Sequence, residues 1–165
     1  MAVERTKALD ETGWRLLQSL QDYARLSYAP LGQRVGLSSS SVIERVHRME
    51  EAGIITGYHA AVDLRAVGLP VLALIQLRSF VGQNCRQVIA KASELPEVLA
   101  TYQVTGTNCV MLKVAAASME HLEHIIEQLS LYGPAETSIV LSKPMERRTL
   151  TREVLERAEG EEESR

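Results

Sequence analysis

One segment limits what this chain can fold into more than any other. It covers residues 31–55 and reads LGQRVGLSSSSVIERVHRMEEAGII. The pattern predicts a short helix over residues 31–35, a tight turn, and a longer helix over residues 39–52. Gly36 supplies the turn, because glycine adopts a left-handed backbone conformation at little cost. Ser38 is a good N-cap for the second helix.

The second helix separates its side chains by chemistry when they are placed at roughly 100° per residue. An apolar stripe that anchors the helix consists of Val42, Ile43, Val46 and Met49. The opposite, largely basic face consists of Ser41, Glu44, Arg45 and Arg48. Arginine contacts phosphate or pairs bidentately with guanine, so the pattern is typical of a helix-turn-helix whose second helix enters the major groove. The same residues also fit two packed amphipathic helices that bind nothing.

A further helix is expected before this pair, over residues 9–21, with Asp10 as its cap. Its apolar spacing comes from Leu16, Leu17 and Leu20. Trp14 and Arg15 are expected near its outer side. The three helices predict a small DNA-binding head, with or without a wing. Residues 54–62 (IITGYHAAV) could add a short strand, and Tyr58 and His59 are interpreted there as turn residues rather than DNA contacts.

The second half of the chain has a different pattern. Strands are expected over residues 71–77, 98–105, 109–115 and 137–141, and helices over residues 85–95 and after Ser118. The order β-α-β-β-α-β is the ferredoxin-like split unit. The fold class is therefore α+β. Because the strands are apolar on both faces, the face without helices is expected to meet another subunit.

These patterns divide the chain into four parts. We expect a helix-turn-helix domain over residues 1–62, a linker over 63–70, a ferredoxin-like domain for ligand binding and oligomerisation over 71–148, and an acidic tail over 149–165. The net charge of −3 belongs to that tail, which carries three Arg against six Glu. A neutral body with a local basic helix is compatible with DNA binding.

Composition also indicates the compartment. No apolar run is long enough to span a membrane, and the charged N-terminal stretch lacks the apolar core of a signal peptide, so a cytoplasmic location without membrane contact is expected. Cys85 and Cys109 show no CxxC spacing, and both are expected as free thiols. His121 and His124 are interpreted as a surface pair, and no metal or cofactor is expected.

From residue 9 to about residue 148 the chain resembles the leucine-responsive regulator/AsnC family of bacterial and archaeal transcription regulators. The resemblance rests on LDETGWRLLQSLQ, on the segment LGQRVGLSSSSVIERVHRMEEAGIITGY, and on the β-α-β-β-α-β region with VTGTN at its second turn. It implies sequence-specific binding of double-stranded DNA. By resemblance, the DNA-binding residues are Arg34, Ser39, Ser40, Ser41, Arg45 and Arg48.

The resemblance also implies regulation by a small molecule. Members of the family form homodimers that assemble further, into tetramers or octamers, and effectors that are usually amino acids alter assembly or DNA affinity. The implied effector-binding residues are Thr105, Gly106, Thr107 and Asn108. Family members commonly carry acidic residues after this glycine, whereas this turn has no carboxylate to hold an amino group. The alternatives are an amino acid bound in a different way, another small molecule, no ligand, or an ordinary polar turn.

Two other functions fit parts of the pattern. One is an enzyme, since some tetrapyrrole decarboxylases are similar to this family in fold. The other is a metabolite sensor whose head does not bind DNA. The intact basic face of residues 39–51 favours the DNA-binding regulator over the sensor. Against the enzyme, the sequence has no nucleotide-binding glycine loop and no base pattern near Cys85 or Cys109.

Overall fold

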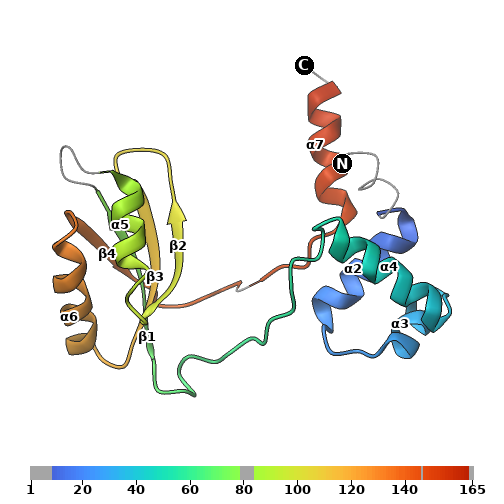
Figure 1. Ribbon diagram of the computed structural model, residues 1–165, viewed down its shortest axis with the longest axis horizontal. Coiled ribbons are helices and arrows are strands. Elements are labelled where there is room, and N and C mark those ends of the chain that lie inside the picture. The colour runs from blue at the N-terminus through green and yellow to red at the C-terminus, as the bar shows by residue number, and fades with distance from the viewer. Residues whose placement is uncertain (1–8, 79–83, 146, 164–165) are drawn as a thin grey trace. The chain divides into compact units, whose positions relative to one another are not determined.

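The computed structural model describes residues 9–78, 84–145 and 147–163 and divides into two units (Figure 1). The head unit comprises residues 1–60 together with residues 145–165, and the sheet unit comprises residues 61–144. The first eight residues of the predicted head and the last two of the predicted tail lie outside the described residues.

The head unit contains the three predicted helices, α2 (Glu11–Asp22), α3 (Tyr28–Val35) and α4 (Ser39–Glu51). Both predicted caps are confirmed: Asp10 accepts a hydrogen bond from the Gly13 amide at 2.7 Å, and Ser38 accepts one from the Ser41 amide at 3.2 Å. The buried apolar side chains are Trp14, Leu16, Leu17, Leu20, Leu31, Val35, Val42, Val46 and Met49.

The prediction that Trp14 lies near the outer side of its helix is wrong, because only 6% of this residue is exposed. Trp14 precedes Leu17 by three residues and therefore shares its face of the helix. The contacts of α2 with α3 extend the buried surface beyond a narrow leucine stripe.

The turn of the helix-turn-helix depends on two glycines. Gly36 ends α3 in the left-handed conformation with φ of 75°, as predicted. Gly32 has a role that the sequence did not indicate: a Cβ there would lie 2.3 Å from the carbonyl oxygen of Leu37, whose amide donates to the Gly32 carbonyl at 2.9 Å. Helix α3 also begins three residues before the predicted start, since Pro30 is tolerated in a first turn.

The sheet unit follows the predicted β-α-β-β-α-β order. Its elements are β1 (Val71–Leu77), α5 (Cys85–Ala92), β2 (Val98–Gln103), β3 (Val110–Ala116), α6 (Met119–Ser130) and β4 (Ala135–Ile139). The strands form one antiparallel sheet in the order β2-β3-β1-β4 (Figure 1). Helices α5 and α6 pack on one face, over alternate residues of β1 and β3 that include Ile75 and Leu112.

The other face of the sheet, which we call the open face, mixes apolar and polar side chains. Strand pairing aligns Gln76 of β1 with Glu136 of β4 and with Met111 of β3. Alternation along the strands places Leu74, Tyr102 and Lys113 on this face as well. The open face is thus less apolar than expected from the sequence.

The C-terminal segment belongs to the head unit. The side chain of Gln21, in α2, pairs with the backbone of Leu150: its amide donates to the carbonyl at 3.1 Å and its oxygen accepts from the amide at 2.9 Å. Arg147 donates to the Gln21 carbonyl at 2.9 Å, and the Thr149 hydroxyl donates to the Asp22 carboxylate. We call residues 147–150 the C-terminal strap; helix α7 (Arg152–Glu163) follows it.

Residues 54–62 form no strand in this structure. Cys85 and Cys109 are joined by a disulfide, with 6.1 Å between their Cα atoms, so the prediction of free thiols is wrong. The two cysteines are 24 residues apart in the sequence, and no sequence pattern indicates that the start of α5 lies beside the turn before β3.

Within the described residues, no helix has the length and apolar character needed to cross a membrane.

Candidate DNA-binding and effector sites

Helix α4 presents an exposed face that differs from the prediction at one position. Val42, Val46 and Met49 are buried as expected. Ile43 is 37% exposed, so its assignment to the anchoring stripe is wrong. The three buried residues lie at spacings of four and three and form a narrow stripe, which leaves Ile43 beside Glu44 and His47 on the outside.

The N-terminal end of α4 carries the three candidate serines. Ser39 and Ser40 are exposed and Ser41 is half-buried. The Ser38 hydroxyl bonds the hydroxyls of Ser40 and Ser41 at 3.0 and 2.9 Å. Backbone amides at a helix N-terminus attract phosphate, so this end of α4 suits an anionic backbone.

Arg45 is half-buried and forms a two-point ion pair with Asp10. Its two terminal nitrogens donate to the two carboxylate oxygens at 2.8 and 2.9 Å. The Arg45 guanidinium lowers the pKa of Asp10, and the Gly13 amide acts in the same direction, against the raising effect of burial. The pair ties α4 to the cap of α2, so Arg45 has a structural partner in addition to its predicted contact with DNA.

The other two candidate arginines also have partners. Arg48 pairs with Glu44 one turn earlier on the same exposed face. Arg34 lies over the ring of Tyr23, with its central carbon 4.5 Å from the ring centre, and its carbonyl accepts from Arg15 at 3.0 Å. Both guanidiniums remain at the surface, where exchange of an ion pair or stacking contact for a phosphate costs little.

Tyr58 follows α4 in the segment that was interpreted as a turn. Its hydroxyl donates to the Glu50 carboxylate at 3.0 Å. Burial and this carboxylate raise the pKa of Tyr58 to about 12. Tyr58 therefore holds the segment after α4 to the helix, in keeping with the interpretation of a structural residue.

The four candidate effector residues share one turn, between β2 and β3. Thr105, Gly106 and Thr107 are exposed and Asn108 is half-buried. Gly106 has φ of 113°, a conformation that favours glycine. The turn is closed by a hydrogen bond from the Val104 amide to the Cys109 carbonyl at 3.1 Å.

Asn108 connects this turn to the open face of the sheet. Its side-chain amide donates to the Gln76 side-chain oxygen at 2.7 Å and to a carboxylate oxygen of Glu136 at 3.4 Å. The turn itself lacks a carboxylate, yet Glu136 of β4 brings one to it. Gln76 and Glu136 were not predicted as site residues, because their proximity to the turn depends on strand pairing between residues more than twenty positions apart.

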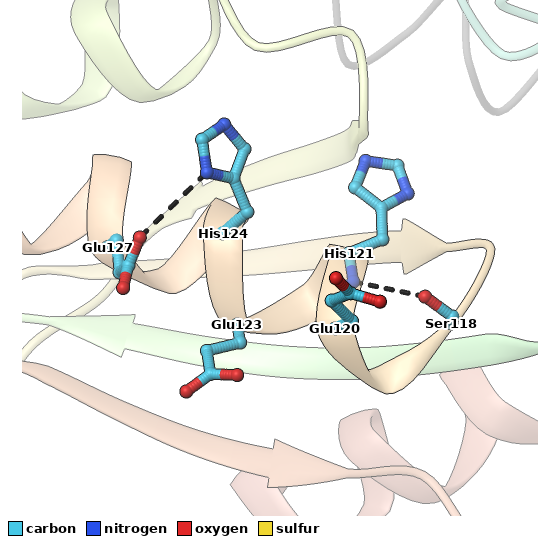
Figure 2. A pocket seen from close by; sticks show the side chains of 6 residues that line it. All are labelled: Ser118, Glu120, His121, Glu123, His124 and Glu127. Carbon is cyan, nitrogen blue, oxygen red and sulfur yellow. Dashed lines mark hydrogen bonds and ion pairs between the residues drawn. The ribbon is translucent and has the colours of Figure 1, made fainter.

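The predicted histidine pair lies on α6, in an open hollow of about 520 Å³ (Figure 2). His121 accepts from the Ala117 amide at 3.2 Å through Nδ1, and its Nε2 lies 3.3 Å from Glu97. His124 lies 3.8 Å from Glu127. Within the described residues, no group of three or more His, Cys, Asp or Glu side chains could hold a metal ion.

A helix-turn-helix head joined to an antiparallel βαββαβ unit with a polar turn at one end defines a two-domain regulator, with one domain for DNA and one for a ligand. Residues 9–56 match the winged helix-turn-helix DNA-binding family, and residues 71–150 match the Lrp/AsnC ligand binding domain. The chain belongs to the Lrp/AsnC family and is a DNA-binding transcription regulator.

Individual relatives agree over most of their length. A helix-turn-helix-type transcriptional regulator of Mycobacterium tuberculosis is 36% identical over 142 residues, which are 84% of this chain and 96% of the relative. The structure of LrpC from Bacillus subtilis is 32% identical with a TM-score of 0.78, and covers 84% of this chain and 99% of its own. A transcriptional regulator from Neisseria meningitidis, solved with L-methionine, is 29% identical with a TM-score of 0.82, over 89% and 99% of the two chains.

Proposed function

We propose that this chain is a cytoplasmic regulator, without enzymatic activity, whose DNA affinity or assembly responds to an amino acid or a related metabolite. Residues 1–62 bind double-stranded DNA, and residues 71–148 bind the effector and form homodimers that assemble into tetramers or octamers. The observation that carries the effector assignment is the Glu136 carboxylate beside Asn108. The complex of the Neisseria meningitidis relative with L-methionine supports the same ligand class.

The effector site is proposed at Thr105, Gly106, Thr107 and Asn108, with Glu136 as the partner of the ammonium group. A charge-assisted hydrogen bond to a carboxylate is stronger than one to a neutral acceptor. Gln76 holds the Asn108 side chain at 2.7 Å, which keeps the amide and the carboxylate on one side of the turn.

The test is a thermal-shift panel with the common amino acids. We expect a single class of amino acid to raise the melting temperature by mass action. The Glu136→Gln variant keeps the shape and removes the charge, so it should weaken that ligand at least tenfold, about 1.4 kcal/mol. Glu127→Gln on α6 is the matched control and should leave binding unchanged. A flat panel with intact DNA binding contradicts an amino-acid effector.

The DNA-binding residues are proposed as Arg34, Ser39, Ser40, Ser41, Arg45 and Arg48. The exposed N-terminal end of α4 suits a phosphate or a base edge. Arg45 can contact DNA in two ways: its guanidinium either binds Asp10 and DNA at the same time or gives up the ion pair with Asp10. Removing an arginine that contacts phosphate should weaken binding to all sequences and reduce the salt slope by about one.

Three variants separate contact from structure. Arg48→Met and Arg45→Met should each weaken binding to a random-sequence duplex, measured by fluorescence anisotropy over a salt series. Asp10→Asn releases the guanidinium of Arg45 but keeps the helix cap. If Arg45 contacts DNA, Asp10→Asn binds at least as tightly as wild type. Equal losses of DNA affinity in Asp10→Asn and Arg45→Met would assign Arg45 a purely structural role.

A further inference from the structure

The disulfide lies at the boundary of the proposed effector turn. Cys85 is the first residue of α5, and Cys109 directly follows Asn108. The Cys109 backbone is bonded on both sides, since its amide donates to the Leu77 carbonyl at 3.0 Å and its carbonyl accepts from Val104 at 3.1 Å. The S–S bond therefore adds a covalent tie between the end of this turn and the start of α5.

The disulfide lies at the edge of the hydrophobic core, against which Cys109 packs. Both Cys85 and Cys109 are half-buried rather than enclosed in the core. Asn84 caps α5 by accepting from the Arg86 amide at 3.0 Å, so the start of the helix has a support that does not depend on the disulfide. Opening the bond therefore leaves the helix cap and the backbone hydrogen bonds of Cys109 in place and removes the covalent tie between the turn and α5.

A pair of cysteines this close has one common use in a reducing compartment. Cytosolic disulfides are usually transient and serve catalysis or redox sensing, because cellular dithiols reduce structural ones. We propose that Cys85 and Cys109 form a reversible thiol–disulfide switch that sets the mobility of the effector turn. This inference rests on the proposed function in two respects, because the cytoplasmic compartment and the effector role of the turn are both proposed there; the thiol chemistry itself needs only the cysteine pair.

The oxidant is a hydroperoxide and the reductant a dithiol. One thiol takes an oxygen atom from the peroxide and becomes a sulfenic acid, and the peroxide leaves as water or an alcohol. The second thiol attacks that sulfur, the S–S bond forms, and water leaves. In reverse, a dithiol attacks the disulfide through a mixed disulfide and leaves oxidised, with both protein thiols restored.

The first experiment measures the thiol state of the full chain. Purified protein is treated with hydrogen peroxide or with dithiothreitol, its free thiols are alkylated, and the mass of the intact chain is measured by mass spectrometry. We expect the oxidised chain to carry no alkyl group and to remain a single covalent chain, and the reduced chain to carry two. Failure of peroxide to protect both thiols, or failure of excess dithiothreitol to reopen the bond, overturns the proposal.

The second experiment measures the turn itself by hydrogen exchange. Amides of residues 104–109 should exchange at least about threefold faster in the reduced than in the oxidised chain, while those of β1 stay unchanged. The Cys85→Ser/Cys109→Ser variant should show the fast rate under both treatments. Equal rates in oxidised and reduced wild type would overturn the switch. Because neither readout uses an effector, a flat amino-acid panel would contradict the effector assignment without affecting these results.

Discussion

Two glycines in the turn of the helix-turn-helix are required for different reasons. At Gly36 only the backbone conformation is at issue, because a Cβ there would meet open space. At Gly32 the Cβ would collide with the Leu37 carbonyl. We expect Gly36→Ala to lower the free energy of unfolding by about 1–2 kcal/mol. Gly32→Ala should lower it by about 3 kcal/mol.

Urea denaturation of the two glycine variants, followed by circular dichroism, measures this difference. Gly160→Ala in α7, where a Cβ would also meet open space, is the control and should not lower the free energy of unfolding, because alanine favours a helix over glycine. A smaller loss for Gly32→Ala than for Gly36→Ala would contradict the close approach of the two backbone segments.

The Asp10–Arg45 pair predicts how stability responds to acid. Because the folded state lowers the pKa of Asp10, the contribution of this carboxylate is present above its unfolded pKa near 3.8 and is lost as pH falls through the lower folded value. Both side chains are partly exposed, so the pair contributes about 0.5–1 kcal/mol after solvent screening. Asp10→Asn should be less stable than wild type at pH 7, and the difference in stability should shrink as pH falls below about 3.8.

Melting temperatures of wild type, Asp10→Asn, Arg45→Met and the double variant at pH 7 and pH 3 test the pair. The coupling between the two substitutions should be measurable at pH 7 and smaller at pH 3, where protonation of Asp10 has begun to remove its charge. A coupling that is the same at both values would show that charge does not hold these side chains together.

Residues whose role depends on their neighbours in sequence were predictable. Asp10 and Ser38 cap helices through contacts three residues away, which a sequence pattern contains. Arg45 and Asp10 are 35 residues apart, and no pattern joins them. The same holds for Asn108 and Glu136, so the turn was predictable while the carboxylate that borders it was not.

At the scale of elements, the bounds of a helix or strand were predicted well where the sequence marks both of its ends. Strand β1 has both predicted bounds, because Pro70 precedes it and its apolar run is continuous. Helix α3 was predicted too short, since a proline in a first turn looks like a boundary. The order of strands followed from the order of elements, because the split β-α-β arrangement restricts the pairing.

The C-terminal strap should stabilise the head unit. Gln21→Ala removes both hydrogen bonds to Leu150, and we expect it to lower the free energy of unfolding of the head by about 1 kcal/mol. Hydrogen exchange at residues 147–150 should accelerate at the same time. Gln33→Ala on the exposed side of α3 is the control and should change neither the stability of the head nor the exchange of the strap. Unchanged exchange in the strap of Gln21→Ala would show that these bonds do not hold it.

At the scale of the whole molecule, the open face predicts self-association. Leu74 lies at its centre on β1, paired with Lys113 on one side and Ser138 on the other. We expect wild type to be a dimer or larger by light scattering, and Leu74→Glu to shift the mass toward one chain. Leu131→Glu, at the exposed end of α6, should leave the mass unchanged. A monomeric wild type would contradict the proposed assembly.

The strap also has a consequence for biosynthesis. Gln21 is synthesised 129 residues before Leu150, its hydrogen-bonding partner. Domains near the N-terminus usually fold while the rest of the chain is still being made. The helices of this head can do the same, but its last contacts form only after the sheet unit has left the ribosome. A polypeptide interrupted before residue 147 therefore carries an incomplete DNA-binding head, whereas every full-length copy carries a complete one.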